Sequence, residues 1–223
     1  MSVKKVFSFR KIALTSFILF GLLLCVGLPV LAQTLDVHKV VQKIQDVYKP
    51  SCCFTASFDQ LTVNVAMDMR DRFQGRMYVR KPLDIALEVI SPERQKVVMK
   101  GRNYVVYFFD DGSQVNGEVP PEINIENFFG FFTNISALDK NFTIELSPRQ
   151  TEPDDKMIFL ELTNTANAQT GFKIVLGVDN KQFTIVRAII YDALGNYNRF
   201  DLFNITFLKS IPDSRFEIRP AQN

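Results

Sequence analysis

Hydrophobic and polar residues alternate with a period of two along most of this chain, which is typical of half-buried β-strands. The clearest example is Phe73–Val89, where apolar residues alternate with charged ones on both sides of a Lys81-Pro82 pair. Proline has no amide hydrogen to donate and favours extended geometry in the residue before it, so the chain is expected to turn there without forming a helix. If the period of two continues through the turn, Lys81 lies on the apolar face.

The same alternation predicts about eleven strands. Because short polar turns separate most of them, sequence neighbours are expected to pair antiparallel. Eleven strands are too many for a flat open sheet, so the sheet is expected to curl into a barrel or half-barrel. The predicted strands are Cys53–Val65, Met67–Arg80, Asp84–Ile90, Lys96–Lys100, Tyr104–Phe109, Phe142–Leu146, Met157–Thr163, Phe172–Val178, Phe183–Tyr191, Tyr197–Phe207 and a last short strand at Phe216–Ile218.

Two segments have helical patterns, which makes the expected fold mainly β with helices, of the α+β class. Thr34–Tyr48 has its apolar residues on one face, and Pro50 ends it. Ile123–Ile135 is apolar on nearly every side, so it must be covered on several faces or contact an apolar ligand. An ordinary core helix is the alternative. At its centre four phenylalanines surround one glycine: Phe128, Phe129, Phe131 and Phe132.

The N-terminus has the pattern of a secretory signal peptide. Four basic residues precede an uncharged run from Ile12 to Leu28, and Val30-Leu31-Ala32 provides a cleavage site. We expect residues 1–32 to be removed and residues 33–223 to form a single domain. Two alternatives are an uncleaved membrane anchor and lipidation at Cys25, although lipidated cysteines usually follow a small residue and Cys25 follows leucine.

Loss of the signal peptide changes the charge of the chain. The whole sequence has 26 basic and 24 acidic residues, and all four basic residues of the signal would go, leaving 22 basic residues. The mature chain is therefore slightly acidic, which gives no reason to expect nucleic acid as a partner.

Candidate chemistry is sparse. Cys52 and Cys53 are adjacent, so a bond between them would need a strained ring. They are expected to be buried and reduced or to cross-link two molecules. His38 is the only histidine, which argues against a metal site and leaves no obvious general base. The acidic pairs Asp110-Asp111 and Asp154-Asp155 are typical of solvated turns. We therefore expect no catalytic residue, no metal and no cofactor, and we expect an apolar binding cavity instead.

The order of the motifs resembles the LolA-like family of periplasmic outer-membrane lipoprotein carriers. An opening helix precedes a strand that ends in a Phe-x-Gln motif, and a Gly-x-x-hydrophobic hairpin follows later. The similar segments are Phe54–Gln60, Gly75–Pro82, Gly101–Phe109, Val178-Asp179, Asp192–Asn196 and Ile211–Pro220.

The resemblance implies an unclosed β-barrel whose helices form a lid over bound acyl chains. Lipidated lipoproteins would be collected in the periplasm from an inner-membrane lipoprotein-releasing ABC transporter. They would be delivered to an outer-membrane acceptor lipoprotein or to the outer membrane directly, by a carrier that is expected to be monomeric. In the family an arginine just before the proline latches the lid; the matching residue here is Lys81, with Arg80 beside it.

On this interpretation an apolar face binds the acyl chains, and the phenylalanine helix competes with the cargo for that face. Rival interpretations are an envelope protein of the same fold that binds lipid or glycolipid, and one that senses lipoproteins without carrying them. The lid would be formed by Phe128, Phe129, Phe131 and Phe132. The expected cavity residues are Met77, Val79, Ile85, Leu87, Val89, Val97, Val105 and Tyr107.

Overall fold

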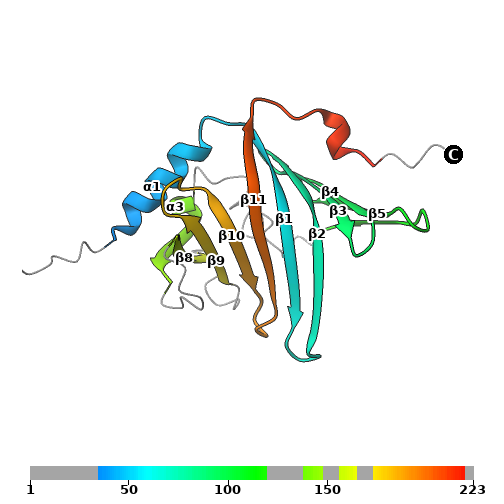
Figure 1. The fold of residues 1–223 in the computed structure, drawn as a ribbon, viewed down its shortest axis with the longest axis horizontal. Helices are drawn as coiled ribbons and strands as arrows, with labels where there is room; N and C mark the ends of the chain where they lie inside the picture. Colours follow the sequence, from blue (N-terminus) through cyan, green and yellow to red (C-terminus); the bar gives the residue numbers. More distant parts are fainter. Residues whose placement is uncertain (1–34, 120–137, 148–155, 165–172, 219–223) are drawn as a thin grey trace, which may run out of the picture. The chain divides into compact units, whose positions relative to one another are not determined.

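The computed structural model of the chain describes residues 35–119, 138–147, 156–164 and 173–218 (Figure 1). The predicted signal peptide, the predicted helix at 123–135 and its four phenylalanines lie outside these ranges. Contacts group the chain from Asp36 onward into one compact unit. None of the helices within the described ranges is long and apolar enough to span a membrane.

Eleven strands of the described residues form one antiparallel sheet, which confirms the predicted unclosed barrel. The order across the sheet is β6-β5-β4-β3-β2-β1-β11-β10-β9-β8-β7, so the first and last strands in the sequence pair at its centre. The strands are β1 (Cys53–Asn64), β2 (Met69–Arg80), β3 (Asp84–Ser91), β4 (Gln95–Lys100), β5 (Asn103–Phe108), β6 (Gln114–Glu118), β7 (Phe142–Leu146), β8 (Met157–Asn164), β9 (Lys173–Asp179), β10 (Ile185–Tyr191) and β11 (Tyr197–Leu208).

Helix α1 (Val37–Tyr48) begins three residues later than the sequence pattern suggested. The side chain of Asp36 accepts a hydrogen bond from the backbone N–H of His38 at 3.0 Å, which caps the first turn. The buried side of the helix carries Val40, Ile44 and Tyr48. A second, short helix, α3 (Leu138–Asn141), precedes β7.

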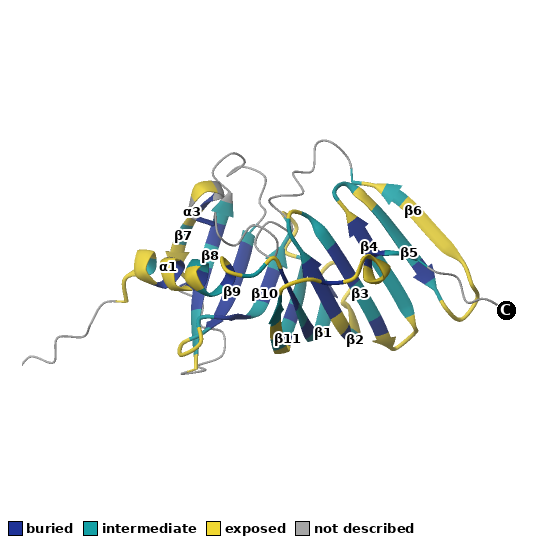
Figure 2. Cartoon of the chain, turned by 90° about the horizontal axis from the view of Figure 1, so that it is seen from above, coloured by how far each residue is buried: buried dark blue, intermediate teal, exposed yellow. Residues whose placement is uncertain are grey.

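The two faces of the sheet differ in what covers them. We call the face against which α1 packs the inner face. Its core cluster joins α1 to the central strands and to β7–β10 through side chains such as Phe58, Met77 and Leu176. In Figure 2 the buried residues concentrate in β1, β2 and β8–β10, whereas β6 is largely exposed.

On the opposite, outer face the C-terminal segment covers a smaller cluster. Phe216 is 1% exposed and packs with Tyr78, Ala86 and Val98. The predicted strand at Phe216–Ile218 is wrong, because residues Asp213–Phe216 form the 3₁₀ helix η3 after Pro212. The number of strands is still eleven, because β6, which the sequence pattern did not reveal, replaces the predicted last strand.

The two cysteines of this part of the chain are both free. Cys53 is the first residue of β1 and is buried in the outer-face cluster, as the pattern predicted for a small apolar residue. Burial raises the pKa of its thiol to about 12, which makes it a poor nucleophile. The expected burial is wrong for Cys52, which is exposed; its Sγ lies 3.0 Å from the carbonyl oxygen of Lys209.

Candidate functional site

The register of β2, β3 and β4 places six of the eight expected cavity residues on the inner face. Residues that lie opposite each other in neighbouring strands point to the same side of a sheet. Met77 lies opposite Leu87, which lies opposite Val97 on the next strand. The six inner-face residues are Met77, Val79, Ile85, Leu87, Val89 and Val97.

The other two expected cavity residues, Val105 and Tyr107, point to the outer face, so their placement with Val97 is wrong. The two-residue turn Gly101-Arg102 joins β4 to β5. Such a turn sets odd-numbered residues of one strand opposite even-numbered residues of the next, so Val106 lies opposite Val97. The three-residue loop between β2 and β3 keeps the numbering in step, which is why the prediction succeeded there.

An open groove with a volume of about 360 Å³ lies on the inner face, between β1–β4 and β10–β11. This volume is within the usual range for ligand sites, which are also mostly apolar. Leu87, Val89 and Val97 of the expected set contribute to it. The complete lining is Gln60, Phe73, Leu87, Val89, Gln95, Val97, Ile190, Asn198 and Phe200.

The remaining inner-face residues of the expected set have a structural role. Met77 and Val79 are each 1% exposed and belong to the core cluster that includes α1. Ile85 packs with Met99 and the half-buried Tyr104 nearer the β6 end of the sheet. The groove is therefore smaller than the apolar face that the sequence pattern outlined.

A polar cluster that the sequence did not reveal lies at one side of the groove. The amide Nε2 of Gln60 donates hydrogen bonds to Oγ1 of Thr62 and to Oδ1 of Asn198, both at 3.2 Å. The hydroxyl of Thr62 donates to the same Oδ1 of Asn198 at 2.6 Å. The groove thus combines hydrocarbon with amide groups, those of this cluster and that of Gln95, an arrangement that suits an amphiphile with an apolar chain and a polar linkage.

Lys81 points toward the inner side of the sheet, as the period of two predicted, and holds the end of α1. Its Nζ donates hydrogen bonds to the backbone carbonyl of Tyr48 at 3.0 Å and to that of Ser51 at 2.9 Å. A cation at a helix C-terminus also interacts favourably with the helix dipole. Burial lowers the pKa of the Lys81 ammonium group from its usual value. The contact described is with α1; the predicted lid residues are outside the described ranges.

Arg80 lies on the outer face, and the contacts described for it are with that face. Its guanidinium group donates to Asp84 at 2.7 Å and to Asp213 at 2.6 Å, and it stacks over the ring of Phe216. The guanidinium group in turn holds the pKa of the Asp213 carboxyl group below its usual value. Arg80 therefore fixes the C-terminal segment to the outer face.

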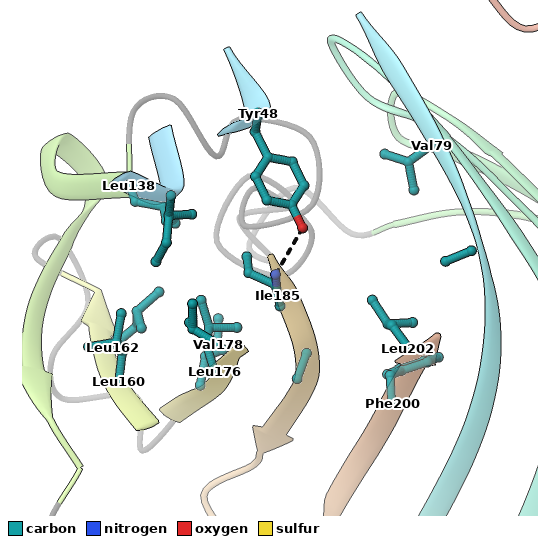
Figure 3. Close-up of a cluster of buried hydrophobic side chains, with 14 of the residues drawn as sticks. Tyr48, Val79, Leu138, Leu160, Leu162, Leu176, Val178, Ile185, Phe200 and Leu202 are labelled. Carbon is teal, nitrogen blue, oxygen red and sulfur yellow. Dashed lines mark hydrogen bonds between the residues drawn. The ribbon is translucent and has the colours of Figure 1, made fainter. Parts of the chain in front are cut away.

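Tyr48 joins the end of α1 to both halves of the inner face (Figure 3). Its hydroxyl oxygen accepts a hydrogen bond from the backbone N–H of Ile185 at 3.0 Å. Its ring packs edge-on against Phe54 and Phe207, with centroid distances of 5.8 and 4.9 Å. Burial raises the pKa of the phenol well above its usual range, so the group stays neutral.

The described residues contain no group of three or more His, Cys, Asp or Glu side chains that could hold a metal ion. Asp110 and Asp111 lie in an exposed turn, where the carboxylate of Asp111 accepts a hydrogen bond from the N–H of Ser113. Asp154-Asp155 lies outside the described ranges.

The family model described as outer membrane lipoprotein carrier protein LolA matches residues 51–219. No curated protein matches the chain. Among solved structures, a LolA superfamily protein from Nitrosomonas europaea is 15% identical, with a TM-score of 0.43, over 83% of this chain and 99% of that one. An uncharacterised conserved protein from Thermus thermophilus is 10% identical, with a TM-score of 0.49, over 82% of this chain and 94% of that one. Lipoprotein LppX from Mycobacterium tuberculosis is 13% identical, with a TM-score of 0.42, over 76% and 96%.

Proposed function

Because the chain belongs to the LolA family of outer membrane lipoprotein carrier proteins, we propose that it carries the acyl chains of lipoproteins across the periplasm in its inner-face groove. The observation that supports this most is the apolar groove of about 360 Å³ between β1–β4 and β10–β11. The source of the cargo is an inner-membrane lipoprotein-releasing ABC transporter, and its destination is an acceptor lipoprotein or the outer membrane itself. The carrier works as a monomer, after cleavage of residues 1–32, and performs no catalysis.

The physical need for such a carrier follows from the cost of exposing hydrocarbon to water. Each buried methylene group contributes roughly 0.8 kcal/mol, so a lipoprotein with several long acyl chains leaves a membrane very slowly without cover. A carrier must cover the chains and yet release them. Moderate net affinity results if cargo replaces apolar contacts that the empty protein already makes, and Phe128, Phe129, Phe131 and Phe132 are the side chains proposed to make them.

A matched pair of variants tests the role of the groove. Val97 and Val105 are both half-buried valines on neighbouring strands, but they point to opposite faces. Val97→Glu places a carboxylate in the hydrocarbon lining, and it is expected to weaken binding of a fluorescent fatty acid by at least about tenfold. Val105→Glu changes the outer face by the same chemistry and is expected to bind the probe normally.

The same pair decides the transport role in cells. Depletion of the protein is expected to strand lipoproteins in the inner membrane, and Val105→Glu, but not Val97→Glu, is expected to restore their export. Equal binding by the two variants, or export that is unaffected by depletion, would end the carrier proposal.

The polar cluster of Gln60, Thr62 and Asn198 favours one second candidate, an envelope protein that binds a lipid or glycolipid with hydrogen-bonding groups. Amides beside hydrocarbon suit sugar hydroxyls as well as the ester or amide linkages of a lipoprotein. Native mass spectrometry of the protein purified from the envelope separates the two, because acylated peptides and glycolipids differ in mass and fragmentation.

A further inference from the structure

Two neighbouring turns at one end of the sheet expose large apolar side chains. One turn joins β1 to β2, and the other joins β10 to β11; the backbone N–H of Val65 donates to Oδ1 of Asn196 at 2.9 Å and holds them together (Figure 1). We call the four exposed side chains the apolar tip. They are Val65, Met67, Met69 and Leu194, with exposed fractions of 58%, 68%, 50% and 81%.

The backbone of both turns is already hydrogen-bonded within the protein. In the first turn the N–H of Met67 donates to Oδ1 of Asn64 at 3.1 Å. In the second, one carboxylate oxygen of Asp192 accepts from the N–H groups of Leu194 and Asn196, at 2.8 and 2.9 Å. Side-chain capping of this kind fixes the shape of a turn. The apolar side chains of the tip therefore project from a backbone whose shape is fixed and in which several N–H groups are already paired.

The apolar tip suits a lipid bilayer better than a protein partner. β2, β1, β11 and β10 are interior strands of the sheet, so the tip offers no free edge to which another chain could add a strand. A bilayer favours segments whose backbone polar groups are satisfied internally, and the capped N–H groups of Met67, Leu194 and Asn196 meet this need.

The residues around the tip are also those expected at a membrane surface. Tyr191 and Tyr197 pack together at its base, with ring centroids 5.5 Å apart. Tyrosine is enriched at the boundary between hydrocarbon and water. Arg70 and Arg72 have exposed, long side chains that can reach headgroups while their stems stay apolar. They are balanced by Asp68 and Asp71, so the attraction is mainly hydrophobic rather than electrostatic.

We propose that the apolar tip inserts into the interfacial layer of a phospholipid bilayer and docks the protein on the membrane. The inference deepens the proposed carrier function, on which it rests for its biological meaning. Gln60 of the groove lies four residues from the end of β1, and Asn198 lies two residues from Asn196. At about 3.3 Å per residue in a strand, Gln60 lies about 13 Å from the end of β1, so docking of the tip brings the groove close to the lipid.

Because the chain contains no tryptophan, single-tryptophan variants report the position of each site directly. Met67→Trp and Leu194→Trp place the reporter in the tip. Phe203→Trp is the matched control, because Phe203 is a 46% exposed aromatic residue on the outer face of β11. The full chain, purified as the cell makes it and free of cargo, is mixed with vesicles of phosphatidylethanolamine and phosphatidylglycerol whose acyl chains carry bromine.

We expect bromine to quench both tip reporters and to shift their emission to shorter wavelengths, while the Phe203→Trp reporter stays unquenched. The comparison holds even if an N-terminal segment anchors the chain, since the anchor is common to all variants. A second pair of variants tests the contribution of the tip to vesicle affinity. Met67→Asp and Leu194→Asp are each expected to weaken vesicle binding by roughly tenfold.

Tip reporters that are quenched no more than the Phe203→Trp control would overturn the docking proposal, whether the true partner of the tip is a protein or nothing at all. That failure is separate from failure of the carrier function, because fatty-acid binding in the groove is measured without vesicles. A protein that binds the probe but not the bilayer remains a carrier without this docking surface.

Discussion

Replacement of Tyr48 by phenylalanine tests how the helix is fixed to the sheet. Tyr48→Phe keeps the ring contacts with Phe54 and Phe207 but leaves the buried N–H of Ile185 without its acceptor. An unsatisfied buried donor costs about 1–3 kcal/mol. For a chain of this size, each kcal/mol lowers the melting temperature by roughly 2–4 °C.

Urea unfolding followed by far-ultraviolet circular dichroism measures this loss. Tyr107→Phe is the control, because Tyr107 is also buried but its hydroxyl has no hydrogen-bond partner within the described residues. We expect Tyr107→Phe to be nearly neutral. Tyr48→Ala, which removes the ring as well, is expected to cost about 3–5 kcal/mol and to accelerate hydrogen exchange in α1. An unchanged urea midpoint in Tyr48→Phe would refute the anchoring role of the hydroxyl.

Two further predictions concern the contacts at the end of β2. Lys81→Met removes two hydrogen bonds to the end of α1 and is expected to destabilise the protein by about 1 kcal/mol, with faster hydrogen exchange confined to that helix; exchange that is uniform or unchanged would show that Lys81 is no latch. The pKa of Asp213 is lowered from 3.8 by Arg80, so this pair stabilises the C-terminal segment above pH 3.8, and the contribution is lost as the pH falls through the lowered value. Arg80→Ala is expected to increase proteolysis of that segment at pH 7 and to remove its acid dependence; equal proteolysis in both proteins would contradict the role of the pair.

Most of the sheet could be predicted from the sequence because many of its strands alternate and many of its turns are short. The errors have local physical causes. Val105 and Tyr107 were placed on the wrong face because a two-residue turn shifts which residues oppose each other, and alternation within one strand carries no information about its neighbour. The sequence pattern predicts a strand at Phe216, although this residue enters the outer-face cluster from a 3₁₀ helix.

The groove was harder to predict than the fold. Sequence alternation identifies an apolar face, but it does not distinguish Met77, which the core buries, from Leu87, which lines the groove. The polar cluster of Gln60, Thr62 and Asn198 comes from β1 and β11, which are far apart in the sequence and pair only at the centre of the sheet. Lys81 was placed correctly because a single period of two connects it to Met77.

The most direct test of the account uses a lipopeptide whose acyl chains carry a photoreactive diazirine. After irradiation and proteolysis, mass spectrometry locates the labelled residues. The account predicts labels on groove residues such as Phe73, Leu87 and Phe200, and none on outer-face residues such as Tyr78 and Val98. Labels spread equally over both faces, or confined to the outer face, would contradict the claim that the inner-face groove holds the acyl chain.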